Sequence, residues 1–281
     1  MNINRKILLE GPVWCRQSSA WFFVDIPAGT LYKCDGVNSS VLFSAGEPIS
    51  NVVETSSGLL LSGRNNFFLH NHGVTVVKSW FSAEEGLRCN DGSVGPDGRY
   101  YFGTMEITPT GLNGHLYTLD DRGKVTRQGS GIGIPNTFVW LDERHVLITD
   151  SLIRKTFKVE LLSCGLLDWP NRELWLDLSA SSATADGGAL DEDGNVWLAI
   201  WGNAAIHKYS AHGDLLEKLE LKALQPTSCA FGGKYMNELL ITTATEGMSV
   251  DQLKAYPDSG MFLIKKVSVK GKPLIMFGLQ E

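Results

Sequence analysis

A recurring pattern of apolar runs and polar turns organises the chain, and it is clearest over residues 186–201. Asp186 opens a short apolar run, a glycine-bearing acidic turn follows at residues 191–195, and a second, strongly apolar run ends at Trp201. Two apolar runs separated by turn-forming residues predict a β-hairpin. This hairpin therefore has a carboxylate at its entrance.

The same pattern occurs six times, at intervals of roughly 39 to 50 residues. This period is typical of β-propellers, in which each repeat forms one four-stranded blade. We therefore predict an all-β fold, a six-bladed β-propeller of four-stranded antiparallel blades that forms a single domain over residues 1–281. The residues at the entrance positions of the six repeats are Glu10, Ile49, Asn90, Asn136, Asp186 and Thr227.

Features outside these hairpins fit a closed ring. Residues 214–222 alone approach a helical period, and their position after a glycine turn favours an outer strand. We expect the apolar residues 7–9 to pair with the last blade, beside residues 273–277, because such pairing leaves no open edge. The loops 109–114 and 179–185 are rich in small residues and are expected above the entrance face, on the substrate side.

Composition and charge narrow the range of functions. Apolar residues make up 43% of the chain and charged residues 20%, an ordinary globular composition. The net charge of −6, with scattered lysines and arginines, argues against nucleic acid as a partner. No apolar run approaches the roughly 20 residues of a membrane span, and residues 1–10 lack the apolar core of a secretion signal. We therefore expect no membrane partner and a cytoplasmic location.

The five cysteines are widely separated and include no C-x-x-C pair. This spacing favours reduced, structural thiols over a disulfide framework or a thiolate zinc site. The sequence leaves the oligomeric state open.

In a propeller the innermost strands line the central channel, so the six entrance residues should form a ring at one mouth. Four of them, Glu10, Asn90, Asn136 and Asp186, carry a hard oxygen ligand, and none of the six is His or Cys. Such a set favours calcium, magnesium or manganese, with zinc in an open site as an alternative. Asn and Asp also cap turns at strand entrances. Four such residues in register favour a metal site over simple capping.

Five ordered segments carry a more specific signal: residues 10–14, residues 88–105, residues 133–136 with 149–151, the stretch that begins at Asp186, and residues 226–233 with 242–244. Together they resemble the senescence marker protein/gluconolactonase family, also called regucalcin-like. The resemblance implies a six-bladed propeller, one divalent metal ion at the axis and hydrolysis of sugar lactones. By this resemblance Glu10, Asn136 and Asp186 would bind the metal, with calcium favoured over zinc, manganese and magnesium, while Arg88 and Asn90 would hold the substrate.

The residues themselves support part of this assignment. Arg88 and Asn90 are two positions apart on an extended segment, so their side chains point the same way, toward the channel mouth. Asp91 points to the other side and is expected to serve a turn or an inter-blade hydrogen bond. Asp186 is the candidate general base, with a metal-activated water as the alternative, because a neighbouring cation lowers the pKa of a carboxyl group and weakens it as a base.

The chain departs from the family pattern at two informative positions. Thr137 follows Asn136 where Gly is usual, and Thr110 stands where some members carry an acidic residue that touches the sugar. The identity of the sugar therefore stays open. The leading hypothesis is a metal-dependent hydrolase that opens an aldonolactone to the aldonic acid. The alternatives are a propeller hydrolase for other lactones, esters or organophosphates, and a non-catalytic calcium-binding regulatory propeller.

Overall fold

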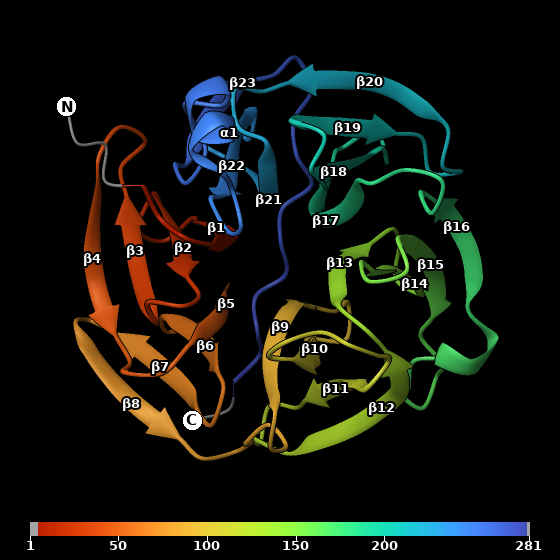
Figure 1. Ribbon diagram of the computed structural model, residues 1–281. Coiled ribbons are helices and arrows are strands. Elements are labelled where there is room, and N and C mark those ends of the chain that lie inside the picture. The colour runs from red at the N-terminus through yellow and green to blue at the C-terminus, as the bar shows by residue number, and fades with distance from the viewer. Residues whose placement is uncertain (1–4, 280–281) are drawn as a thin grey trace.

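Six antiparallel sheets surround a central axis in the computed structural model, which describes residues 5–279 (Figure 1). In five sheets four strands follow one another in chain order, and the sixth sheet has three strands within the described residues. The innermost strands are β1, β5, β9, β13, β17 and β21, whose bounds are given below. The prediction of an all-β, six-bladed propeller is confirmed.

The first half of the chain forms blades 1 to 3. Blade 1 contains β1 (Leu9–Cys15), β2 (Ala20–Asp25), β3 (Thr30–Cys34) and β4 (Ser39–Ser44). Blade 2 contains β5 (Ile49–Glu54), β6 (Leu59–Gly63), β7 (Phe67–Asn71) and β8 (Val74–Lys78). Blade 3 contains β9 (Leu87–Val94), β10 (Tyr100–Glu106), β11 (Gly114–Leu119) and β12 (Val125–Ile132).

The second half forms blades 4 to 6 and the short helices. Blade 4 contains β13 (Pro135–Trp140), β14 (His145–Asp150), β15 (Lys155–Glu160) and β16 (Glu173–Asp177), with a 3-10 turn at Trp169–Asn171. Blade 5 contains β17 (Thr184–Leu190), β18 (Val196–Trp201), β19 (Ala205–Tyr209) and β20 (Leu215–Glu220). Blade 6 contains β21 (Gln225–Gly232), β22 (Glu238–Ala244) and β23 (Leu263–Lys266), with α1 (Val250–Ala255) between its last two strands. As expected, residues 214–222 contain an outer strand.

The strands of a blade differ in residue composition because they differ in burial. Every residue of β2, which packs against blades on both of its faces, is buried, whereas no residue of the outer strand β4 is. Aromatic side chains fill the space between neighbouring blades. Between blades 2 and 3, the Phe67 and Phe102 rings meet edge to face at 5.5 Å, and Tyr100 stacks on Phe102 at 5.3 Å. The core is therefore a series of layers between blades, which holds the innermost strands in place.

The two chain ends close the ring in different ways. Leu8 pairs with Ala244 of blade 6, and the Ile7 carbonyl accepts a hydrogen bond from Thr245 N at 2.9 Å, so the expected pairing of residues 7–9 with the last blade is confirmed. The prediction that residues 273–277 lie beside them is wrong. Instead this segment crosses the middle of the ring (Figure 1). Phe277 packs into the core between blades 2 and 3, while Leu274, Ile275 and Met276 are 42–46% exposed. A local apolar run does not specify which partner it finds.

We call residues 271–278 the C-terminal strap. Gly271 N donates to Met236 O of blade 6, and Lys272 N to Leu190 O of blade 5. At its other end Phe277 N donates to Glu54 O of blade 2. All of these acceptors lie at or beyond the ends of the innermost strands, so the strap covers the face opposite the strand entrances.

Candidate metal and substrate site

The strand entrances share one local distortion, a β-bulge. The pairing register between the first two strands of each blade shifts at this position in all six blades. In blade 4 the shift falls between Asn136 and Val139, and in blade 5 between Ala185 and Gly188. A bulge leaves a residue unpaired and re-aims its side chain. The same device therefore recurs at all six strand entrances, where the candidate site residues lie.

Backbone conformations at the entrances are correspondingly unusual. Gly11 has φ +56°, and a Cβ at this position would lie 2.6 Å from Asn51 Oδ1, so only glycine fits. Thr137 has φ 82°, in a region that β-branched residues strongly disfavour. Its hydroxyl donates to Asp186 O at 2.5 Å and lies 2.6 Å from Thr149 Oγ1. These hydrogen bonds hold Thr137 in the conformation for which the family pattern uses Gly.

A chain of hydrogen bonds links the substrate and metal candidates. Arg88 Nη1 donates to Asn90 Oδ1 at 2.7 Å, and Asn90 Nδ2 donates to Asn136 Oδ1 at 2.7 Å. Asn136 Nδ2 in turn donates to Ser151 Oγ at 2.9 Å, and Ser151 Oγ donates to Ala185 O at 2.7 Å. Because each amide uses its NH₂ as the donor, the oxygen of Asn136 is directed to the side where Asn90 lies. The chain runs across blades 3, 4 and 5.

Two carboxylates converge on the same place. Glu10 is 9% exposed and Asp186 6% exposed. Burial, reinforced by the charge of Asp91, raises the pKa of Glu10 to about 8. Burial, then repulsion from Glu10 and Asp91, raises the pKa of Asp186 well above its ordinary value. Glu10 and Asp186 therefore lie close enough to repel each other in a buried site.

Arg88 is the cation that faces these carboxylates. Its positive charge opposes the pKa increase of both Glu10 and Asp186. Burial lowers the pKa of the Arg88 guanidinium, while the charge of Glu246, on the loop after β22, and that of Glu10 raise it. One guanidinium faces two buried carboxylates, so the site as a whole has an excess of negative charge and favours a cation.

The donor set fits a hard divalent cation. Within residues 5–279 no group of three or more His, Cys, Asp or Glu side chains is arranged to hold a metal ion. The candidate site instead combines the carboxylates of Glu10 and Asp186 with the amide oxygen of Asn136. Oxygen donors of this kind suit calcium, magnesium or manganese.

All five residues singled out from the sequence thus lie at one mouth of the channel. Arg88 and Asn90 point the same way, as their spacing predicted, and they are hydrogen-bonded to each other. Asp91 takes the inter-blade role expected of it, because its Oδ1 accepts from Asn51 Nδ2 of blade 2 at 3.2 Å. Burial raises the pKa of Asp91 to about 7.

The entrance alignment missed several residues that build the site. Ile49 is fully buried, and blade 2 contributes the next residues instead: Ser50 Oγ donates to Cys89 O, and Asn51 Nδ2 to Gly92 O. Ser151 belongs to the motif 149–151, yet its contact with Asn136 depends on how blades 4 and 5 meet. A two-residue offset from the entrance position Ile49 was the available signal for Asn51. No signal in the local sequence identified the role of Ser151.

The loop at residues 109–114 leaves the end of β10, where Met105 pairs with Arg88, so it lies at the same mouth. Thr110 N donates to Glu106 Oε2 at 2.7 Å, and Gly111 N donates to the same oxygen at 2.9 Å. These and further hydrogen bonds lower the pKa of Glu106 to about 2. The Glu106 carboxylate therefore holds the loop through hydrogen bonds from Thr110 N and Gly111 N. Some members of the family have an acidic residue at the position of Thr110 itself.

A six-bladed propeller with carboxylate and amide side chains gathered at one mouth of its channel defines the class of this protein. Its sequence matches the family described as "SMP-30/Gluconolactonase/LRE-like region" over residues 8–245, and the chain belongs to that family. An uncharacterized protein of Sulfolobus acidocaldarius is 34% identical, with 94% of each chain covered. Regucalcin of Macaca fascicularis is 31% identical, with 93% of this chain and 92% of the relative covered.

A solved structure extends the likeness to three dimensions. The chain is similar to a calcium-binding protein, regucalcin, from Agrobacterium tumefaciens, with a TM-score of 0.91 and 26% identity over 98% of this chain and 95% of the other. A gluconolactonase from Xanthomonas campestris shares the fold at a TM-score of 0.71 and 18% identity, over 85% of this chain and 84% of the other. In the part of the chain that the structure describes, no helix has both the length and the apolar character needed to cross a membrane.

Proposed function

We propose that this protein is a metal-dependent hydrolase that opens a sugar lactone to the corresponding aldonic acid. The observation that carries the proposal is the meeting of Glu10, Asn136 and Asp186 with Arg88 and Asn90 at one mouth of the channel. Membership of a gluconolactonase family and the likeness to regucalcin support the same conclusion. Membership of that family also supports a small-molecule lactone as the substrate.

Glu10, Asn136 and Asp186 would hold the divalent cation, for which calcium is our first choice. When bound, such an ion polarises a carbonyl as a Lewis acid and stabilises the developing negative charge on its oxygen. The structural support is the donor set itself, because two buried carboxylates lie beside a single guanidinium. Burial and then repulsion between neighbouring acids raise both of their pKa values, so a bound dication would offset the second of these two causes.

Arg88 and Asn90 position the substrate. Arg88 uses Nη1 to hold Cys89 O at 2.9 Å and Asn90 Oδ1 at 2.7 Å. A guanidinium carries five N–H donors in a planar fork, so donors on its other nitrogens remain for lactone or hydroxyl oxygens. The bond to Asn90 fixes the direction of that fork. These residues therefore orient the ring toward Asp186.

Asp186 completes the hydrolysis as general base. The oxygen of a water molecule forms a bond with the lactone carbonyl carbon, and the proton of that water passes to the Asp186 carboxylate. The ring C–O bond then breaks, and the leaving alkoxide takes up the proton to give the hydroxy acid. A cation next to Asp186 lowers its basicity, so the position of the proton is set by a balance of two opposing effects.

A proton-release assay tests the proposal. Aldonolactones are offered alongside an unrelated lactone, an aryl ester and an organophosphate, with calcium or with a chelator. We expect acid release from one or more aldonolactones in calcium and its loss in chelator. Hydrolysis that persists in chelator contradicts the role of the metal, and preference for an ester or organophosphate contradicts the sugar specificity.

The second candidate is a calcium-binding regulatory protein without catalysis, which the description of the Agrobacterium relative as a calcium-binding protein favours. Calcium binding by calorimetry, together with no hydrolysis of any compound in the panel, would support it. Both functions require the same ligands, so the assay for turnover separates them.

A further inference from the structure

A second cavity lies on the axis behind the candidate site. It has a volume of about 390 Å³, within the range of small-molecule pockets. Its wall starts immediately beyond the entrance positions, and all six innermost strands contribute to it. Residues 272–275 of the C-terminal strap line its other end. We call this space the axial cavity.

A layer of side chains lies between the axial cavity and the site. Asn51 and Asp91 line the cavity and are hydrogen-bonded to each other, and Asn51 also donates to Gly92 O. Thr137 lines the cavity too, with its hydroxyl bound to Asp186 O. The polar groups of this layer are therefore already hydrogen-bonded to other groups of the protein. A ligand in the axial cavity would therefore meet the groups beyond this layer.

Two polar groups beyond the layer have no partner. Glu54 lines the cavity and is 4% exposed, yet in the described part of the chain its Oε1 accepts no hydrogen bond. Trp140 also lines the cavity, and its buried Nε1 donates to no described residue. Buried polar groups are normally satisfied, and an unsatisfied carboxylate oxygen costs more than a neutral one. Glu54 therefore brings to the cavity wall a buried carboxyl group whose Oε1 has no hydrogen-bond donor among the described residues.

The charge and shape of the lining restrict that partner. The lining includes four acids, Glu54, Asp91, Asp142 and Glu143, and one lysine, Lys272. Asp91 already accepts from Asn51, and Asp142 and Glu143 are exposed, so Glu54 is the buried acid of the wall whose Oε1 accepts no hydrogen bond within residues 5–279. Most of the remaining wall is apolar and includes the aromatic rings of Phe138, Trp140 and Phe231. Aromatic faces and carboxylates both attract organic cations. We propose that the axial cavity binds a small organic amine, with its ammonium group at Glu54 and its apolar body among the aromatic rings.

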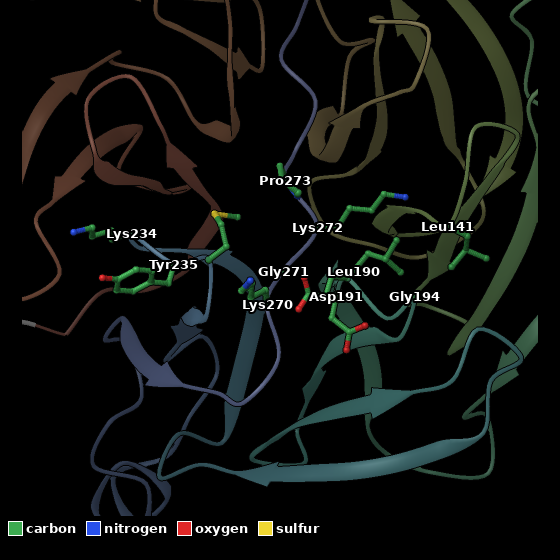
Figure 2. Close-up of a pocket in the computed structure, with 12 residues that line it drawn as sticks. Leu141, Leu190, Asp191, Gly194, Lys234, Tyr235, Lys270, Gly271, Lys272 and Pro273 are labelled. Atoms are coloured by element: carbon green, nitrogen blue, oxygen red, sulfur yellow. The ribbon is translucent and has the colours of Figure 1, made fainter.

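A neighbouring groove shows that this preference is local. Figure 2 shows this groove, of about 540 Å³, which shares Leu190, Lys272 and Pro273 with the axial cavity. Lys234 and Lys270, together with the shared Lys272, contribute three positive charges to it. Its buried carboxylate, Asp191, is already paired with Lys208 at 3.0 Å. The groove therefore holds no buried acid in need of a cation. Amine binding should depend on Glu54 and be independent of this groove.

The test uses 2-phenylethylamine as the probe, titrated calorimetrically into the full-length protein. The neutral analogue 2-phenylethanol and the anion 3-phenylpropionate have nearly the same shape. We expect one saturable site for the amine, at least about tenfold tighter than for the alcohol, which corresponds to about 1.4 kcal/mol. Equal affinity for the amine and the alcohol, or no binding of the amine, overturns the proposal.

Variants locate the site. Glu54→Gln should weaken amine binding at least about tenfold and leave the affinity for the alcohol unchanged, since 1.4 kcal/mol is expected from loss of the charge. Ala189→Leu, which fills part of the cavity, should weaken both compounds, and it serves as a second test should Glu54→Gln fold poorly. Glu192→Gln, at an exposed acid that lines the neighbouring groove and not the axial cavity, is the matched control and should change neither affinity.

Asp186→Ala separates this inference from the proposed function. It removes a carboxylate from the candidate site and should leave amine binding intact. Loss of amine binding in this variant, with Glu54→Gln unaffected, would place the amine at the entrance mouth and overturn the inference.

Discussion

The two mouths of the central channel are built from the same six strands and have opposite characters. At the entrance mouth, bulges and left-handed backbone conformations bring carboxylates, amides and a guanidinium together, and two of the acids repel each other. At the far mouth the strand ends lead into ordinary turns, and an apolar segment of the chain, the C-terminal strap, crosses them. Backbone strain and electrostatic repulsion are thus concentrated at the entrance mouth, while the C-terminal strap covers the far mouth.

The contrast shows how a propeller separates chemistry from stability. Strained or repulsive groups persist only where the surrounding structure holds them. Here the hydrogen bonds of Ser151 to Asn136 and of Thr137 to Asp186 O hold the candidate ligands, while the strap is hydrogen-bonded at the opposite ends of the strands. Substitutions at the entrance mouth should therefore change activity or metal binding, and those at the far mouth should change the free energy of unfolding.

The largest effect is expected from Asp186→Ala. Loss of a metal ligand that also serves as the base should lower kcat/KM for the aldonolactone by at least about 10³-fold, since metal assistance is worth several kcal/mol. The measurement is proton release in calcium-replete buffer, with Asp193→Ala, an exposed acid of the far turn, as the matched control. Rates within about threefold of the wild type would remove Asp186 from the site.

Phe277→Ala should produce the largest loss of stability. The Phe277 side chain is fully buried in the core between blades 2 and 3, and its removal leaves a cavity that costs about 3–5 kcal/mol of unfolding free energy. Urea denaturation measures the loss. Met276→Ala, at a half-exposed neighbour on the strap, should cost less than about 1 kcal/mol. If Phe277→Ala impairs kcat/KM of the folded protein, the two mouths are not independent.

Ser151→Ala sharpens the comparison because Ser151 touches no candidate substrate group. Its hydroxyl accepts from Asn136 Nδ2 and donates to Ala185 O, so its loss frees the amide of a proposed metal ligand. Calcium affinity, measured by calorimetry, should fall about 10- to 100-fold. Ser151→Thr, which retains the hydroxyl, should restore most of it. Unchanged calcium affinity in the alanine variant would contradict the orientation of Asn136 as a ligand.

The smallest effect concerns Asp191, a fully buried acid at the far face. Burial raises its pKa, but hydrogen bonds from Trp197, Asn195 and Lys208 outweigh burial and lower it overall. A lowered pKa contributes stability above the unfolded-state pKa, and this contribution is lost as pH falls through the folded-state pKa. The stability advantage of the wild type over Asp191→Asn should therefore shrink by about 1 kcal/mol between pH 6 and pH 3. Urea denaturation across this range measures it, and a constant difference would contradict the assignment.

Much of the fold follows from periodicity, because a repeat that cannot bury its own faces must stack on its neighbours. The same logic placed Glu10, Asn136 and Asp186 together, since residues at equivalent positions of a ring converge on its axis. The strand period placed Arg88 and Asn90 on one side. These predictions need only the register of the repeats, which glycine turns and apolar runs show plainly.

The remaining features depend on contacts between distant parts of the chain. The apolar run 273–277 reads like one more strand, and its path across the ring is set by the position of the pocket that receives Phe277. The residue type of Thr137 disfavours a left-handed backbone, so the signal for one was the glycine that the family pattern has at this position. Helix α1 begins with a capping box between Ser249 and Gln252, which is a recognisable helix start. With six residues, however, the helix is too short for a helical repeat of apolar residues to be detected in the sequence.

The C-terminal strap also has a consequence for cooperativity. In a repeat protein each unit contacts only its neighbours, so units can open one at a time. Here one segment is hydrogen-bonded to blades 5 and 6 at one end and to blade 2 at the other, which are not all adjacent. Opening any of these blades breaks contacts that also hold another. Amide hydrogen exchange in the innermost strands should therefore show a single unfolding unit that covers most of the ring, rather than a gradient from blade to blade.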